Sequence, residues 1–211
     1  MSAALVDVPA PDGNATRHDV EAALLRHFGF VRFVGWNLTE LTLKGLDFHG
    51  CAFLRCRGAR ADFSSCDCTE ARFTACDFNN TSWRRAGLAA AIFQDCKLTG
   101  MRIEDARTLG LAFERCLMIS AHLHGLSFRR ATLEGLDFQD ADVTEVDFRD
   151  AVLTQCSLKD ANVIGARFEG ADLRGADLGN LRLADVSKFK GAIISKRQAA
   201  ALLSSLGLKV A

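Results

Sequence analysis

The sequence predicts an all-β solenoid in which the chain turns a corner every five residues. Large apolar residues recur at every fifth position from Phe33 to Ile193, and 30 of these 33 positions hold Phe, Leu, Ile, Val, Met, Trp or Cys. A second column of apolar residues, mostly small, lies two positions before the first. No insertion breaks this register. A period of five fits neither a helix nor a flat strand, so two side chains in every five must point inward between regularly spaced corners.

The repeating unit resembles that of the pentapeptide-repeat family, roughly A-[DN]-[LF]-x-x. Good copies of the unit are Ala61-Asp62-Phe63, Ala141-Asp142-Val143, Ala161-Asn162-Val163, Ala171-Asp172-Leu173 and Ala176-Asp177-Leu178. The resemblance implies a right-handed quadrilateral β-helix over residues 30–194, with four pentapeptides per coil and about eight coils. At the ~4.8 Å spacing of hydrogen-bonded strands, eight coils would be on the order of 40 Å long.

Four pentapeptides per coil would stack residues that lie twenty apart. One such column reads Phe33, Phe53, Phe73, Phe93, Phe113, Leu133, Leu153, Leu173 and Ile193. The polar or glycine exceptions within the two inward columns are Gly58, Thr108, Lys188, Thr81 and Gly191. Glycines recur two residues after the central position, where a positive φ is expected at a turn. Examples are Gly100, Gly125, Gly135, Gly165, Gly170 and Gly175.

Each end of a solenoid needs a cap over its apolar core. At the N-terminal end, residues 1–29, we expect a mobile segment over residues 1–16 and then a short helix whose N-cap is Asp19. At the C-terminal end, residues 195–211, Ser195 and Gln198 form a capping-box pattern that opens a helix through Ser205, and Gly207 ends it. This helix is either a lid over the last coil or a dimer contact. The apolar residues of the segment are Leu202, Leu203, Leu206, Leu208 and Val210.

Nothing in the sequence suggests catalysis, a cofactor or a metal site. Seven of the eight cysteines occupy the small inward column and Cys68 a central position, as expected for buried apolar side chains. No zinc-type pair of C-x-x-C motifs occurs, and His122 and His124 flank the inward Leu123 on one solvated wall. The sequence also lacks a secretory signal and an apolar run long enough to cross a bilayer, so we expect a cytoplasmic protein without membrane contact.

The formal net charge is zero, yet the charges are unevenly placed along the chain. Residues 17–130 hold 16 basic and 12 acidic side chains, whereas residues 131–185 hold 5 basic and 12 acidic ones. Residues 186–211 hold five basic side chains and no acidic one. The candidate partner-binding residues are the carboxylates of the acidic segment, which we expect to point outward. They are Glu134, Asp137, Asp140, Asp142, Glu145, Asp147, Asp150, Asp172 and Asp177.

The C-terminal segment and the unbroken frame resemble the Qnr and MfpA class of quinolone-resistance pentapeptide-repeat proteins. That resemblance implies a homodimer joined through the C-terminal helix. It also implies an acidic surface that mimics duplex DNA, binds DNA gyrase or topoisomerase IV, and protects it from fluoroquinolones or a natural poison. For any single aspartate the alternative is structural, because Asp before the central residue can bond the turn backbone.

The class is acidic overall, whereas this chain is neutral with a basic N-terminal half. The basic residues there include Arg55, Arg57, Arg60, Arg84, Arg85, Arg129 and Arg130. Either the acidic segment alone contacts the topoisomerase, or the partner differs and the chain is a non-catalytic scaffold for another protein. Direct nucleic-acid binding through the arginines is disfavoured by the acidic neighbouring segment and by the lack of exposed aromatic positions.

Overall fold

The computed structural model of this chain describes residues 4–179, 186–205 and 207–209. It confirms the predicted fold class: the chain is a mostly-β solenoid of about seven turns with parallel strands and a short C-terminal helix. The chain divides into two compact units, residues 1–117 (unit 1) and residues 118–211 (unit 2). In the described part of either unit, no helix has the length and apolar character needed to cross a bilayer.

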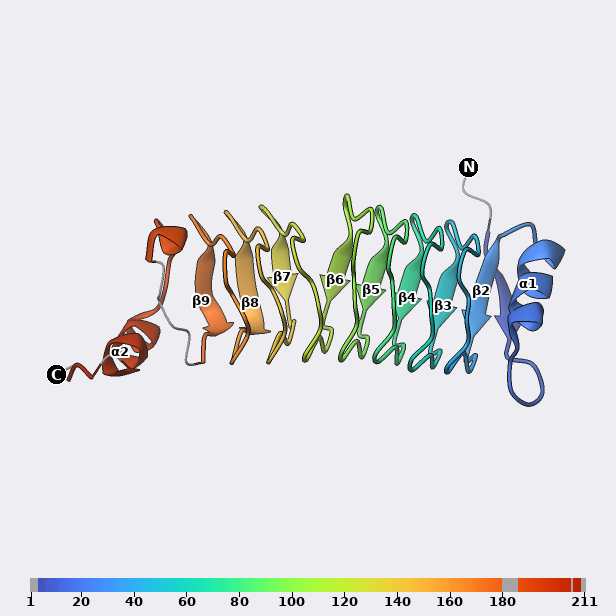
Figure 1. Ribbon diagram of the computed structural model, residues 1–211, viewed down its shortest axis with the longest axis horizontal. Helices are drawn as coiled ribbons and strands as arrows, with labels where there is room; N and C mark the ends of the chain where they lie inside the picture. The colour runs from blue at the N-terminus through green and yellow to red at the C-terminus, as the bar shows by residue number, and fades with distance from the viewer. Residues whose placement is uncertain (1–3, 180–185, 206, 210–211) are drawn as a thin grey trace. The chain divides into compact units, whose positions relative to one another are not determined.

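Unit 1 contains a six-stranded parallel sheet in which each strand pairs with the next in sequence order (Figure 1). Its elements are β1 (Val6–Pro9), α1 (Arg17–Arg26), β2 (Val31–Val34), β3 (Ala52–Leu54), β4 (Arg72–Thr74), β5 (Ile92–Gln94) and β6 (Ala112–Glu114). The register from β2 onward advances by twenty residues per coil, as predicted, because Phe33 pairs with Phe53 and Phe53 with Phe73. The stacked rings of this column have centroids 4.4–5.3 Å apart.

Two irregular residues of unit 1 are explained by their neighbours. The indole N–H of buried Trp83 donates a 2.9 Å hydrogen bond to the hydroxyl of Thr81, which donates in turn to the Phe78 carbonyl. A buried indole N–H needs such an acceptor, so the polar residue in the small column satisfies the large one. Gly58 stands in the central column because a Cβ there would lie 2.7 Å from the ring of Phe78.

The N-terminal end differs from two sequence expectations. Within the segment expected to be mobile, residues 6–9 form strand β1, which pairs in parallel with β2, and the carbonyl of Val8 accepts a 2.9 Å bond from the Trp36 indole. The N-cap of α1 is Thr16 and not Asp19. Asp19 is the third residue of the helix, and its carboxylate accepts the Thr16 backbone N–H while the Thr16 hydroxyl accepts the Asp19 N–H. The sequence T-x-x-D was therefore a reciprocal capping box.

Unit 2 contains a three-stranded parallel sheet followed by two short helices (Figure 1). Its elements are β7 (Thr132–Glu134), β8 (Val152–Ser157), β9 (Asp172–Asp177), the 3-10 helix η1 (Val186–Phe189) and α2 (Lys196–Ser205). The positive φ predicted for turn glycines is present at Gly100, Gly125, Gly135, Gly165 and Gly170 but not at Gly175. There β9 continues through the expected corner with a register shift against β8. The residue must still be glycine, because a Cβ would lie 2.9 Å from the Leu153 carbonyl oxygen.

The last coil contains one more residue than the sequence frame allows. In regular coils the amide of a central residue donates to the carbonyl nineteen positions ahead, as from Phe138 to Ser157, but Phe168 donates to Lys188, twenty ahead. Phe189 consequently stacks on Phe168 with ring centroids 4.8 Å apart. Ile193 is 48% exposed and pairs with Asp172. The prediction of an unbroken frame ending at Ile193 is therefore wrong by one residue, since a one-residue slip changes which side chains face inward.

Helix α2 is hydrogen-bonded to the last coil through β9. The predicted capping box is present, because the Ser195 amide donates to the Gln198 side-chain oxygen at 2.6 Å and the Gln198 amide donates to the Ser195 hydroxyl. The Gln198 side-chain amide donates to the carbonyls of Leu173 at 2.7 Å and Ala176 at 2.8 Å. The helix ends at Ser205, and Gly207 beyond it has the expected positive φ of +83°. In these contacts α2 is a lid.

Candidate functional site: the acidic corner of unit 2

Five of the candidate carboxylates hold turns of the solenoid in place. Each precedes a central residue and accepts the backbone N–H of the residue two positions later at 2.9–3.1 Å. These residues are Asp137, Asp142, Asp147, Asp172 and Asp177. Aspartate therefore bonds the turn backbone at these positions, as the repeat suggested. Only the second oxygen of each carboxylate is left for contacts with other groups.

Three other candidates stand at the corners themselves. Asp140, Glu145 and Asp150 lie two residues after a central residue, where φ is +54°, +59° and +59°. All three are exposed. Glu134 lies one position earlier in its repeat and is exposed as well. A corner side chain projects from the solenoid with no wall beside it, so these four carboxylates are accessible to a partner.

Arginine or histidine side chains lie beside several of the candidates. The Asp172 carboxylate binds Arg174 at 2.6 Å, Asp150 lies 3.8 Å from Arg130, and Glu145 lies 3.6 Å from His124. No ion pair is found within the described residues for Glu134, Asp137, Asp140, Asp142 or Asp177. Fewer carboxylates of unit 2 are thus available to a partner than the nine candidates from the sequence.

Asp137, Asp140, Asp142 and Asp160 gather at one corner of unit 2, which we call the acidic corner. Asp137 and Asp142 lie on the two walls that meet at Asp140, since their backbones pair with Ser157 and Asn162 of the next coil. The Asp140 amide donates to the Lys159 carbonyl, so Asp140 and Asp160 occupy the same corner position one coil apart. Asp160 was absent from the sequence candidates, although its distance of twenty residues from Asp140 was a signal for it.

The acidic corner carries negative charge at neutral pH. Burial raises the pKa of Asp142, but hydrogen bonds from the Thr144 hydroxyl and amide outweigh burial and leave that pKa below its usual value. The nearby His122 and His124 act in the same direction. Lys159 directly precedes Asp160 in the chain, and it is an exposed basic residue at this corner. The carboxylates outnumber it at this corner.

Asp147 does not point outward, contrary to the sequence prediction. It is only 7% exposed, and its carboxylate accepts hydrogen bonds from Arg149 at 2.8 Å and from Arg167 at 3.0 Å. The hydrogen bonds from Arg149 hold the pKa of the Asp147 carboxyl below its usual value. Arg167 lies twenty residues after Asp147, so the next coil supplies the second partner. Asp147 therefore stabilises unit 2 and is not a free binding carboxylate.

Replacing Asp147 with asparagine is expected to destabilise unit 2 by about 1–3 kcal/mol, because Arg149 and Arg167 lose their shared charged acceptor. Because the folded-state pKa is lowered, this stabilisation is complete above the unfolded pKa of about 3.9 and is lost as pH falls through the folded value. Hydrogen exchange of unit 2 peptides between neutral and acidic pH measures it. Asp137→Asn is the control, since Asp137 makes the same turn bond without an arginine. An equal effect of Asp137→Asn and Asp147→Asn would contradict this role.

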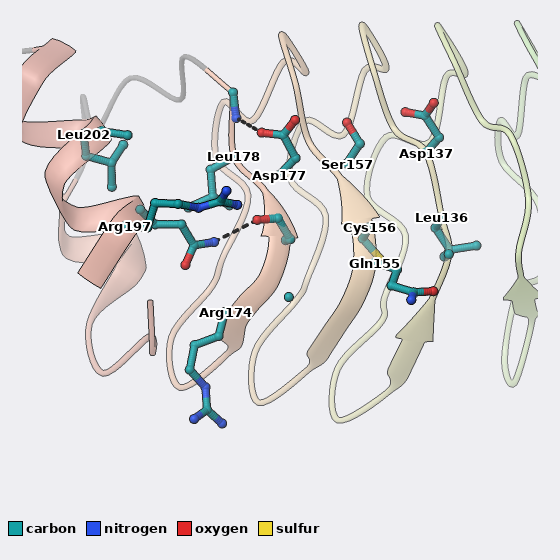
Figure 2. Close-up of a pocket in the computed structure, with 16 residues that line it drawn as sticks. Leu136, Asp137, Gln155, Cys156, Ser157, Arg174, Asp177, Leu178, Arg197 and Leu202 are labelled. Carbon is teal, nitrogen blue, oxygen red and sulfur yellow. Dashed lines mark hydrogen bonds between the residues drawn. The ribbon is translucent and has the colours of Figure 1, made fainter. Parts of the chain in front are cut away.

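A groove of about 810 Å³ lies beneath α2 in unit 2 (Figure 2). Asp137, Ser157 and Asp177 line one side of it, and Arg197, Gln198 and Leu202 of α2 line another. Arg174 points away from α2 in Figure 2. Its guanidinium binds the Asp172 carboxylate at 2.6 Å. The groove shares Asp137 with the acidic corner. Its lining residues include no nucleophile with a neighbouring base.

The C-terminal leucines divide between the lid and the free surface. Leu202 is 9% exposed, whereas Leu203 and Leu208 are 40% and 56% exposed. Leu206 and Val210 lie outside the described residues. Leu203 and Leu208 are therefore the described residues of this segment that a second copy could contact.

The cysteine side chains are all buried with free thiols. Burial raises the pKa of the Cys66 thiol to about 12 and that of Cys51 to about 11. Such thiols are protonated at neutral pH and act as small apolar residues of the core, as the sequence predicted. Within the part of the chain that the structure describes, no three His, Cys, Asp or Glu side chains are placed to hold a metal ion.

Comparisons with known proteins agree with this architecture. Models of pentapeptide repeats match residues 66–137, 119–162 and 147–187. A solved structure of a trypsin-treated variant of QnrB1, described as a plasmid-mediated fluoroquinolone resistance protein, is 22% identical with a TM-score of 0.69. It covers 85% of this chain and 100% of its own. Full-length QnrB1 is 21% identical with a TM-score of 0.64, covering 84% of this chain and 100% of its own. A search of curated proteins found no match. The chain belongs to the pentapeptide-repeat family and has a Qnr-like solenoid fold.

Proposed function

We propose that this chain is a non-catalytic, DNA-mimicking protein of the cytoplasm that binds DNA gyrase or topoisomerase IV and protects it from fluoroquinolones or a natural poison. The acidic corner carries the proposal. Its four carboxylates lie on two successive coils of the solenoid. They have no ion-pair partner among the described residues. The likeness to QnrB1, a fluoroquinolone resistance protein, supports the choice of partner.

A basic DNA-binding surface attracts DNA mainly through the negative charge of the phosphate backbone. Duplex DNA is bound largely through phosphates, whose recognition needs charge at the correct place and no base sequence. Carboxylates repeated at the ~4.8 Å strand spacing supply a column of negative charge on a fixed frame. The acidic corner is short, and unit 1 is not acidic. We therefore propose a local contact at unit 2 instead of mimicry along the whole chain.

A second candidate function is a scaffold for an unrelated partner that binds unit 1. The observation that favours it is a pair of neighbouring exposed arginines, Arg84 and Arg85, for which the described residues provide no ion pair. This surface would suit an acidic protein partner. The two candidates use different units, so substitutions can separate them.

The gyrase proposal is tested by changing the acidic corner. Asp140→Lys/Asp160→Lys reverses two exposed corner charges without removing a turn bond, unlike changes at Asp137 or Asp142. In a supercoiling assay with and without a fluoroquinolone, the wild type should protect gyrase, and this variant should lose at least about tenfold in potency, because two charged contacts of ~1 kcal/mol or more become repulsive.

A matched control comes from unit 1. Glu70→Lys/Asp105→Lys makes the same change in net charge at exposed corner positions, where φ is +59° and +53°. It should leave protection unchanged. Protection by neither the wild type nor the variants, together with no binding to gyrase, would exclude the gyrase proposal and leave the scaffold. Equal losses in the two variants would show that net charge matters and the acidic corner does not.

We also propose that two copies join through the exposed face of α2. Because Leu202 is already buried in its own chain, the informative change is Leu203→Ser/Leu208→Ser, which alters only exposed leucines. Light scattering should show a clearly larger mass for the wild type than for this variant at the same concentration, because the variant loses the α2 contact. A variant with the same mass as the wild type at every concentration would contradict a contact through α2.

A further inference from the structure

An apolar surface lies at the opposite end of the chain, at the end of α1. Leu25 is 83% exposed and Phe28 is 87% exposed, and Phe30 two residues later is also exposed. Most phenylalanines of this chain are buried in the central column, so these are exceptions in a protein that otherwise places the residue inside. A cluster of large exposed apolar side chains usually marks a contact surface. We call Leu25, Phe28 and Phe30 the α1 apolar cluster.

The backbone at Phe28 gives an independent reason to expect a contact. Phe28 has a φ of +52° in the turn that ends α1, where the Gly29 amide donates to the Leu24 carbonyl at 2.9 Å. Glycine is the usual residue there, and a bulky side chain in the left-handed region is disfavoured. In the isolated chain, Phe28 thus combines an unfavourable backbone with an exposed ring. Such a combination is expected where the ring is used outside the chain.

The charges of α1 indicate what covers this surface. Val20 and Ala23 are buried against the unit, while His18, Leu25 and Arg26 are exposed on the outer side with Ala22 half-buried. The first turn also holds Arg17, which is paired with Glu21 at 2.7 Å. Acidic Asp19 in the first turn and basic Arg26 in the last turn have no ion pair among the described residues. A second α1 packed antiparallel would place Arg26 of each helix beside Asp19 of its partner. The two helix dipoles would then be antiparallel, which is the favourable arrangement. The charges of α1 are therefore complementary to a second copy of itself.

The neighbouring strand favours side-chain packing over strand pairing at this end. β1 is the outermost strand of its sheet, yet Pro9 has no N–H to donate and Asp7 brings a charge that is paired with Arg32 at 2.8 Å. Proline and charged residues on an edge strand block pairing with another strand. The helix face is left as the means by which a second copy can bind here.

We propose that α1 binds α1 of a second copy, antiparallel about a two-fold axis near Ala22, with Leu25 and Phe28 buried between the copies. A two-fold contact uses the same surface on both chains, so one apolar cluster is sufficient. The small Ala22 side chain allows the two helices to approach closely at the axis. This contact is separate from the one proposed for α2. It does not depend on gyrase binding.

Sedimentation velocity tests the contact in a Leu203→Ser/Leu208→Ser background, where the α2 face is disabled. The background chain should associate to a dimer across the micromolar range. Adding Leu25→Ser/Phe28→Ser should raise the dissociation constant at least about tenfold, because two large apolar side chains per copy lose their burial. Ile164→Ser is the matched control, since Ile164 is also highly exposed but lies in unit 2. It should leave the dimer unchanged.

Cross-linking tests the geometry of the contact. All native cysteines are buried, so an introduced surface cysteine can be read alone. Under mild oxidation Ala22→Cys should form an interchain disulfide much faster than Ile164→Cys, because only a residue near the axis meets its own copy. A background chain that stays monomeric throughout the range would overturn the proposal. So would a dimer unaffected by Leu25→Ser/Phe28→Ser, or equal cross-linking of the two cysteine variants.

Discussion

Replacing Phe73 with alanine is expected to lower the free energy of unfolding of unit 1 by about 3–5 kcal/mol. Phe73 is fully buried, and its ring stacks on Phe53 and Phe93 with centroids 4.8 and 4.4 Å away. It also meets the edges of Phe78 and Trp83. Neighbouring coils are fixed by their own backbone ladders, so they can close the cavity only in part. The change removes contacts on both sides of one coil.

Urea unfolding followed by tryptophan fluorescence measures this effect, because both tryptophans of the chain, Trp36 and Trp83, lie in unit 1. Phe73→Leu is the informative control. Unit 2 uses leucine in the same column at Leu133 and Leu153, so Phe73→Leu should cost clearly less than Phe73→Ala. A loss below about 1 kcal/mol for Phe73→Ala would mean that the aromatic column does not stabilise unit 1.

Replacing Gln198 with alanine is expected to release α2 from the last coil. The side chain makes four hydrogen bonds, two accepted from Ser195 and two donated to the carbonyls of Leu173 and Ala176. Leaving two buried carbonyls without a donor costs about 1–3 kcal/mol for each of them. We expect hydrogen exchange in α2 to rise by at least about tenfold, which corresponds to ~1.4 kcal/mol of local stability.

Gln198→Glu separates the two roles of this residue. A carboxylate can still accept from Ser195 and keep the capping box, but it cannot donate to the carbonyls of Leu173 and Ala176. Its α2 should therefore be released nearly as far as that of Gln198→Ala. The control is Arg197→Ala, because Arg197 is the exposed neighbour. If Gln198→Glu protected α2 as well as the wild type, the bonds to the coil would not be what holds the lid.

The fold could be predicted from the sequence because its period is local and repeated. A column such as Phe33, Phe53 and Phe73 fixes the coil length many times over, so the register of twenty residues was correct. The extra residue of the last coil was missed because a single slip at the end leaves most of the frame intact. Its signals were Lys188 and Gly191, two poor residues for inward positions, with Phe189 directly beside the first.

The candidate site could be predicted only in part, because the repeat does not distinguish charges that are used from charges that are paired. Asp137 and Asp147 occupy the same repeat position and make the same turn bond, but Asp147 is surrounded by Arg149 and Arg167. Pairing between coils depends on residues twenty apart, so reading the columns of polar residues as well as the apolar ones would have separated the two. The same reading would have added Asp160 to Asp140.

The measurement that tests the central claim most directly is displacement of duplex DNA from gyrase. A fluorescent duplex bound to gyrase should be released by the wild-type chain, with the fluorescence anisotropy falling, and release should weaken as salt is raised. The acidic-corner variant Asp140→Lys/Asp160→Lys should release at least about tenfold less DNA at the same concentration, while Glu70→Lys/Asp105→Lys should match the wild type. If the wild type leaves the duplex bound, or if both variants release it equally, the acidic corner is not a DNA mimic.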